Sequence, residues 1–321
     1  MHRIAVALVA ALAAAVASPA WSQAWPSKQV RVVVNFPPGG AADQLMRALA
    51  PRLQEVLGQP FVVENRPGAN GSIGAGEIAK AAPDGHSILM SSGGAIALNG
   101  LIYANLGYDP MKALDPVAPV AVVSVFLEIQ PSIPAANLAE FIAHARANPG
   151  KLNYGSPGNG SSPHLAGEMF NRAAKIQTTH VPYKGAGPAM TDLLGGQLQF
   201  MFDPGIGLQH VRSGKLRMLA VGSPKRHPAW PDVPTVAEVV GGEFDTDTVF
   251  GLYAPAGTPK DVIARLNQEV TRLMQSGPMA ERVAAIGATG LQLTPEAFAA
   301  RVRAEHARMG GLVKEIGLKA N

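Results

Sequence analysis

Short apolar runs alternate along the chain with stretches in which apolar residues recur every three or four positions. A continuous apolar run is typical of a strand buried on both faces of a parallel sheet, and the longer spacing is typical of a helix with one buried face. The predicted strands are 30–34, 61–64, 87–90, 152–154, 178–182, 198–202, 216–221 and 249–254. The predicted helices are 42–57, 72–80, 137–147, 165–174, 188–194, 236–240, 258–274, 279–286 and 294–316.

The order strand, helix, strand, helix, strand occurs twice, in residues 30–90 and again in residues 152–202. This order predicts an α/β fold of two similar domains, each with a parallel sheet between helices. Between the two units lie an irregular, proline-rich stretch at 103–119 and one long extended segment at 120–129, which we expect to cross between the domains. If strand 249–254 crosses back, domain 1 comprises 25–123 with 245–321, and domain 2 comprises 124–244.

Two loops of small residues each follow a predicted strand and precede a predicted helix. Each should present free backbone N–H groups at a helix N-terminus, which is a favourable place for an anion. For the first loop, 35–40, the alternative is a tight turn that needs the conformational freedom of glycine. Its candidate binding residues are Phe36, Pro38, Gly39 and Gly40.

The second loop, 155–164, adds short hydrogen-bond donors. Neutral hydroxyl and N–H groups can hold a carboxylate without a buried lysine or arginine, at about 1 kcal/mol net for each hydrogen bond. The candidate residues are Ser156, Asn159, Gly160, Ser161, Ser162 and His164. Two alternatives stay open, since Ser161 or Ser162 is equally suited to cap the following helix and His164 to pack in the core.

Further candidates lie where predicted strands end, because open α/β sheets bind ligands at the carboxyl ends of their strands. They are Ser91, Ser92, Tyr183, Lys184, Asp203 and, on the returning strand, Phe250. Lys184 is as well suited to a solvated surface position as to pairing with a distal carboxylate of a ligand. Asp203 can accept a hydrogen bond from a ligand ammonium or hydroxyl group, or it can orient its own loop.

The first 24 residues have the pattern of a secretory leader. His2 and Arg3 give a basic start, residues 4–16 are apolar, and Ser22 and Ala24 fit a small-x-small cleavage site, so we expect an exported chain whose mature form begins at Trp25. The apolar run is shorter than the roughly 20 residues needed to span a bilayer. The chain has no cysteine, which excludes disulfides, thiolate metal sites and lipid attachment at a cysteine.

Composition and motifs argue against several other classes of function. The net charge of +4 comes from scattered basic residues, a distribution that does not indicate nucleic-acid binding. The histidines show no metal-ligand spacing, and the sequence contains no hydrolase elbow, zinc-protease motif or P-loop. We therefore expect no metal, no cofactor and no catalytic residue. An exported hydrolase or lyase that uses Ser162, His164 and Asp203 is the alternative hypothesis.

Five stretches are specific in combination, and they run in order through nearly the whole mature chain: 36–43, 63–71, 155–165, 181–188 and 254–259. Together they resemble the substrate-binding receptors of tripartite tricarboxylate transporters, often called Bug-type receptors. The resemblance implies a type II periplasmic-binding-protein fold, in which two domains close like a Venus flytrap on a small carboxylate. It also implies that the receptor works in the periplasm and delivers this ligand to a membrane permease of the tripartite tricarboxylate type. We expect the receptor to be a monomer. A receptor that signals to a sensor kinase is an alternative, since it needs the same closed state.

The resemblance further implies that both glycine-rich loops face the ligand, partly through water. One position departs from the family pattern. Many members carry a Trp immediately before the Phe-Gly of the returning strand, whereas Val249 precedes Phe250 here. The resemblance therefore does not supply an aromatic wall at this position.

Overall fold

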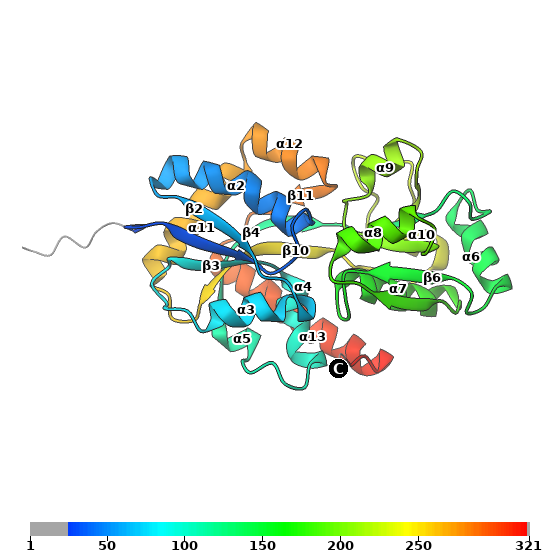
Figure 1. The fold of residues 1–321 in the computed structure, drawn as a ribbon, viewed down its shortest axis with the longest axis horizontal. Coiled ribbons are helices and arrows are strands. Elements are labelled where there is room, and N and C mark those ends of the chain that lie inside the picture. The colour runs from blue at the N-terminus through cyan, green and yellow to red at the C-terminus, as the bar shows by residue number, and fades with distance from the viewer. Residues whose placement is uncertain (1–24, 320–321) are drawn as a thin grey trace, which may run out of the picture.

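The computed structural model describes residues 25–319 of the 321-residue chain, and the predicted leader lies outside the described residues. The described chain forms two α/β domains, the first built on a six-stranded sheet and the second on a five-stranded sheet. Figure 1 shows the two domains side by side along the long axis of the molecule. None of the described helices is both long and apolar enough to cross a membrane.

The first domain has the strand order β11-β4-β10-β3-β1-β2. Strand β1 (Val30–Val34) runs parallel to β2 (Phe61–Asn65) and β3 (Ser87–Ser92). Strand β10 (Thr248–Pro255) lies antiparallel between β3 and β4 (Leu114–Val123), and β11 (Ala288–Gly290) forms the edge. The helices are α2 (Ala41–Leu57), η1 (Ala69–Gly71), α3 (Ser72–Ala79), α4 (Gly93–Ile102), α5 (Pro110–Ala113), α11 (Lys260–Met274), α12 (Gly277–Ala285) and α13 (Pro295–Ile316).

Helices cover both faces of this sheet, with α2, α11 and α12 on one side and α3, α5 and α13 on the other (Figure 1). Val32 and Val34 pack in the core on the first face, and Val33 packs in the core on the second. Because successive residues of a strand point to opposite faces, a strand covered on both sides must be apolar at nearly every position. Full burial of one such valine contributes roughly 1.5–3 kcal/mol to stability.

The second domain has the strand order β7-β6-β8-β5-β9. Strand β6 (Asn153–Ser156) runs parallel to β7 (Thr179–Pro182) and β8 (Phe200–Asp203), whereas β5 (Phe126–Ile129) runs antiparallel to β8 and to β9 (Arg217–Val221). The helices are α6 (Leu138–Ala147), α7 (Ser162–Ala174), α8 (Ala186–Leu194), α9 (Leu208–Arg212) and α10 (Val236–Val240). An aromatic core of Phe141, Phe170 and Phe200 holds the sheet against α6 and α7.

Three parts of the secondary structure differ from the prediction. Helix α4 begins at Gly93, where no helix was predicted; it forms because Ser92 Oγ accepts a hydrogen bond from Ala95 N (3.1 Å) and the residues that follow are buried. The stretch 103–119 contains α5 and more than half of β4. The segment 120–129 is two strands, one in each sheet, with the crossing between the domains at Ser124 and Val125. Both sheets are therefore mixed rather than purely parallel.

The two domains also touch on the side of α7 and α13. Leu165 of α7 packs in one apolar cluster with side chains of α4 and α13 from the first domain. On the same two helices, Arg172 Nη2 lies 2.6 Å from Glu315 Oε1. Exposed ion pairs of this kind are worth at most about 1 kcal/mol, so the apolar cluster is the stronger contact.

Candidate functional site

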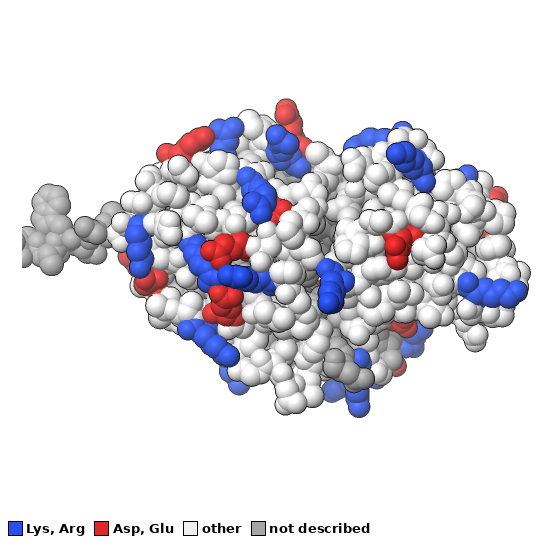
Figure 2. Space-filling view, in the orientation of Figure 1, with Lys and Arg blue, Asp and Glu red and all other residues white. Residues whose placement is uncertain are grey.

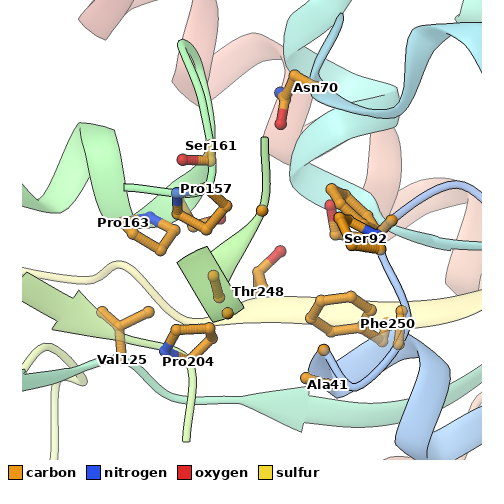
Figure 3. A pocket seen from close by; sticks show the side chains of 18 of the residues that line it. Ala41, Asn70, Ser92, Val125, Pro157, Ser161, Pro163, Pro204, Thr248 and Phe250 are labelled. Atoms are coloured by element: carbon orange, nitrogen blue, oxygen red, sulfur yellow. The ribbon is translucent and has the colours of Figure 1, made fainter. Parts of the chain in front are cut away.

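A cavity of about 60 Å³ lies between the domains, next to the crossing segments (Figure 3). The first domain lines it with Phe36, Pro37, Pro38, Gly40, Ala41, Ala42, Asn70, Ser92, Thr248 and Phe250. The second domain lines it with Pro157, Ser161, Ser162, Pro163, Gly185, Ala186, Gly187 and Pro204, and Val125 lies on the crossing. Both glycine-rich loops thus contribute to one cavity.

Four helix N-termini meet at this cavity, because the cap residues Gly40, Ser92, Ser161 and Gly185 of α2, α4, α7 and α8 all line it. The first turn of a helix leaves N–H groups without partners within the helix, and the helix dipole places about half a positive charge there. The caps Gly40 and Gly185 make no side-chain hydrogen bond to their helices. The first N–H groups of α2 and α8 therefore remain free for a ligand.

The hydroxyl groups on the cavity walls differ in how many of their hydrogen bonds are already made within the protein. Ser161 Oγ accepts from His164 N (3.4 Å) and donates to Gly158 O (2.8 Å), so it serves as the cap of α7. Ser92 Oγ accepts from Ala95 N, which leaves its own proton available. Thr248 Oγ1 likewise accepts from Gly94 N (3.4 Å). The cavity is therefore richer in donors than in acceptors, which favours an anionic ligand.

The rest of the wall is apolar, and none of the described residues that line the cavity carries a charged side chain. Phe36 and Phe250 meet edge to face, with ring centroids 6.2 Å apart. Figure 2 shows Lys and Arg scattered with Asp and Glu over the visible face of both domains. Within the described lining, an anion can therefore be attracted only by main-chain dipoles and neutral donors and not by basic side chains.

The two domains approach each other closely across the cavity at glycine residues. A Cβ on Gly185 would lie 2.5 Å from Pro37 Cγ, and a Cβ on Gly94 would lie 3.1 Å from Ser162 Oγ. Beside the cavity, a Cβ on Gly160 would meet Ile102 Cδ1 of the first domain. The domains therefore stand in a closed arrangement in which glycine is required at the points of contact.

Seven of the residues singled out from the sequence line the cavity: Phe36, Pro38, Gly40, Ser92, Ser161, Ser162 and Phe250. The structure places nine others outside the lining: Gly39, Ser91, Ser156, Asn159, Gly160, His164, Tyr183, Lys184 and Asp203. Several of these nine instead hold the loops in shape, as their hydrogen bonds show.

In the second loop, buried polar groups support the cavity wall from behind. Ser156 Oγ lies 2.7 Å from His180 Nε2 and accepts from Gly158 N, and His164 Nδ1 accepts from Gly160 N (3.0 Å). The rings of His164 and His180 stack with centroids 3.8 Å apart. Burial lowers the pKa of His164 to about 4, and burial together with His164 lowers the pKa of His180 to about 3.

The other displaced candidates have equally local partners. Gly39 N donates to Asp43 Oδ2 (2.9 Å), and Ser91 Oγ accepts from Asn35 Nδ2 (2.9 Å). Tyr183 Oη donates to Asp192 Oδ2 (2.6 Å), while the neighbouring Lys184 is exposed. Val249 points into the core with Tyr253 and Phe298, so a side chain at this position does not form a wall of the cavity.

Some lining residues were missed by the sequence analysis: Pro37, Ala41, Ala42, Asn70, Val125, Pro157, Pro163, Gly185, Ala186, Gly187, Pro204 and Thr248. Thr248 carried a usable signal, because it lies two positions before Phe250 and alternate residues of a strand share a face. Asn70 and Val125 carried none, since only the tertiary fold brings their segments to the cavity.

Neither a metal centre nor a hydrolytic triad is formed by the described residues. No group of three or more His, Asp or Glu side chains among them is arranged to hold a metal ion. His164 is buried against His180, and Asp203 Oδ2 accepts from Gly205 N and Gly207 N (both 2.8 Å). With both partners engaged elsewhere, Ser162 has no base to activate it.

Comparison with known proteins agrees with this geometry. The model of the tripartite tricarboxylate transporter family receptor matches residues 45–318. Protein BugT of Bordetella pertussis is 38% identical over 297 residues, which cover 92% of this chain and 91% of BugT. A solved R. palustris protein with adipate has 35% identity and a TM-score of 0.89, over 92% of this chain and 99% of that one. MatC from Rhodopseudomonas palustris with bound malate has 32% identity and a TM-score of 0.84, over 90% of this chain and 100% of MatC.

The family is one of receptors, and the two solved neighbours named above contain adipate and malate. The chain is accordingly a solute-binding receptor and not an enzyme, and its two-domain fold is that of periplasmic binding proteins. The match over residues 45–318 and the identity to BugT place it beyond a likeness of fold: the chain belongs to the tripartite tricarboxylate transporter receptor family.

Proposed function

We propose that this receptor captures a small carboxylate in the cavity between its domains. The observation that carries the proposal is the convergence of four helix N-termini on a cavity whose described lining has no charged side chain. Such N-termini bind carboxylate and phosphate groups through free N–H groups and the helix dipole. Neutral donors also suit reversible capture, because each contributes only about 1 kcal/mol net.

The arrangement favours a dicarboxylate. Each domain contributes two of the N-termini, and four half charges amount to roughly two positive charges, which match a dianion. The walls between them are apolar, with Phe36, Phe250 and Val125, and suit a short hydrocarbon body. Two solved relatives contain the dicarboxylates adipate and malate.

Domain closure, export and delivery complete the proposal. Domain 1, residues 25–123 with 245–321, and domain 2, residues 124–244, close on the ligand by rotation about the crossings at Ser124–Val125 and before β10. The leader pattern of residues 1–24 supports export to the periplasm and cleavage near Ala24. The receptor works there as a monomer. It then delivers the acid to a membrane permease of the tripartite tricarboxylate type, the transporter for which its family is named.

A thermal-shift panel on protein that has been unfolded, washed and refolded tests the ligand class. We expect dicarboxylates to raise the unfolding temperature, by an amount equivalent to about 2.7 kcal/mol at 100 times the dissociation constant. Adipate should stabilise the receptor whereas its neutral diamide, of the same shape, should not. Equal stabilisation by the diamide, or stabilisation only by uncharged or cationic compounds, would contradict the proposal.

A further inference from the structure

Two carboxyl groups are completely buried in the second domain, where the cavity lining does not use them. Glu128 lies on β5 and Asp203 at the end of β8, and each is 0% exposed. In the β5–β8 ladder Glu128 is opposite Met201, and Phe126 is opposite Asp203. Opposite residues of an antiparallel pair point to the same face, so the two carboxyl side chains are diagonal neighbours within reach of each other.

The hydrogen bonds of the two groups are unequal. Asp203 Oδ2 accepts from Gly205 N and Gly207 N, both at 2.8 Å. Asp203 Oδ1 and both oxygens of Glu128 have no hydrogen-bond partner among the described residues. Gly207 lies between the two groups, since a Cβ on it would be 2.2 Å from Glu128 Oε2.

Two ionised carboxylates cannot share such a site, because burial and mutual repulsion both oppose the second charge. Burial raises the pKa of Glu128 well above its ordinary value, and the charge of Asp203 raises it further. Burial also raises the pKa of Asp203, but the two N–H groups on its Oδ2 favour its ionised form. Asp203 is therefore the group that ionises first, and Glu128 is the group that retains a proton.

The charged and titratable groups on the neighbouring elements are engaged elsewhere or lie at a distance. Asp192 of α8 accepts from Tyr183 Oη, and Arg212 of α9 lies 5.6 Å from the ring centroid of Trp230. His210 of α9 is half-buried, and His227 meets Phe126 edge to face, with its Nδ1 accepting from Ala229 N (3.2 Å). Among the described residues, Asp203 is the only charge that shifts the pKa of Glu128.

The turn from 203 to 207 connects this pair to the cavity and to the first domain. Pro204 lines the cavity, and Gly205 is so close to Ile286 O that a Cβ would overlap the carbonyl. Gly287 of the same corner of the first domain approaches Leu208 and Phe126. Any change in the shape of this turn therefore moves both a wall of the cavity and a contact between the domains.

We propose that the pair of Glu128 and Asp203 retains one proton, which Glu128 carries. This proton keeps the 203–207 turn in the shape needed for ligand capture. Both are positioning residues, because neither lines the cavity. Loss of the proton at alkaline pH places two charges behind the turn and loosens it. The inference goes beyond the receptor function and does not depend on the identity of the ligand.

Infrared difference spectroscopy of the full mature receptor tests it without any ligand. At pH 8 the wild type should show the carbonyl band of one protonated carboxylic acid. The Glu128→Gln variant should lose the band, whereas Asp203→Asn should keep it because Glu128 remains buried. The exposed Glu243→Gln variant is the matched control and should leave the band unchanged. Absence of the band from the wild type would overturn the proposal. A band that is lost in Asp203→Asn and kept in Glu128→Gln would overturn it as well. The wild-type spectrum alone decides whether a proton is retained, even if a variant fails to fold.

The pH dependence of stability provides a second readout. The unfolded chain loses both protons near pH 4, so a proton retained in the folded state makes the free energy of unfolding fall as pH rises towards the folded pKa. Above pH 6, and until the folded pair loses its proton, the free energy of unfolding of the wild type should fall with pH by one proton more than that of Glu128→Gln. Beyond the pH at which this extra fall ends, any acid that stabilises the receptor should bind the wild type more weakly than at pH 7, and should bind the variant equally at both. Identical slopes in the two proteins would contradict the proposal.

Discussion

Pro37 of the first glycine-rich loop lies directly against Gly185 at the start of α8, so that a Cβ on Gly185 would be 2.5 Å from Pro37 Cγ. The two residues belong to different domains, and their contact exists only while the domains are closed. Gly185 also has φ +128°, a conformation that residues with a side chain rarely adopt. One glycine thus serves both the local turn and the closed state.

The Gly185→Ala variant should bind ligand at least tenfold more weakly, because the added methyl group overlaps Pro37 when the domains close. The ligand-free protein should lose about 1–2 kcal/mol of stability from the strained backbone. Gly214→Ala is the control, since Gly214 also has a positive φ (+72°) but has open space at its Cβ position. Isothermal titration and denaturant unfolding separate the two effects. Equal affinities in the two variants would show that the contact does not limit closure.

Ser161 and Ser162 should respond differently to alanine, although they are neighbours. Ser161 Oγ caps α7, so Ser161→Ala should lower the free energy of unfolding of the ligand-free protein by about 1 kcal/mol. Ser162 lines the cavity without being the cap, so Ser162→Ala should keep that stability and weaken binding about fivefold, the equivalent of about 1 kcal/mol. Unfolding and binding curves for both variants check the pair. The reverse pattern would mean that the roles are exchanged.

Leu165→Ala should weaken binding by more than tenfold, because Leu165 of the second domain packs against α4 and α13 of the first. A buried leucine truncated to alanine costs about 2–5 kcal/mol, and here the closed state bears that cost. Leu138→Ala is the control, since Leu138 packs wholly within the second domain. It should lower stability and leave affinity unchanged. A loss of affinity in both variants would point to general loosening instead of an effect on closure.

Acid should destabilise the receptor through His164 and His180. Their folded pKa values, about 4 and about 3, lie below the ordinary value of 6.5, so the unfolded chain binds protons first as pH falls. Stability present above pH 6.5 should decline from there towards pH 3, by on the order of 2 kcal/mol for each of the two histidines at pH 4.5. His180→Gln should flatten this decline, whereas His144→Gln, on the outer helix α6, should not. Urea unfolding between pH 4.5 and 7.5 checks the slopes.

The sequence predicted the regular elements well where apolar patterning decides them. The valine run of β1 and the periodic helix α2 lie within one residue of the expected bounds, because burial on both faces or on one face leaves a clear pattern. Helix α4 was missed, since its first turn contains Gly93 and Gly94, which are poor helix formers. Burial and the Ser92 cap outweigh that preference, and neither is visible in a local pattern.

Within the site, the sequence identified the loops better than the individual side chains. The loops at 35–40 and 155–164 could be recognised because each is a cluster of glycine, proline and small polar residues between a predicted strand and a predicted helix. The direction in which each side chain points could not be recognised. Ser156 faces His180 behind the wall, whereas Ser161 reaches the cavity, and only the strand register and the helix start decide this. The pairing of Glu128 with Asp203 likewise depends on the β5–β8 register.

The absence of charged side chains from the described cavity lining has a consequence for how such a receptor changes over generations. Because the polarised N–H groups belong to the main chain, no single codon replacement can delete the attraction that holds an acid there. Substitutions on the apolar walls can therefore change the volume available to the hydrocarbon part of the ligand, while the main chain continues to bind its carboxylate ends. A receptor of this kind can therefore acquire a new ligand through changes in the shape of the apolar wall alone. Its affinity for anions is kept because it comes from the fold.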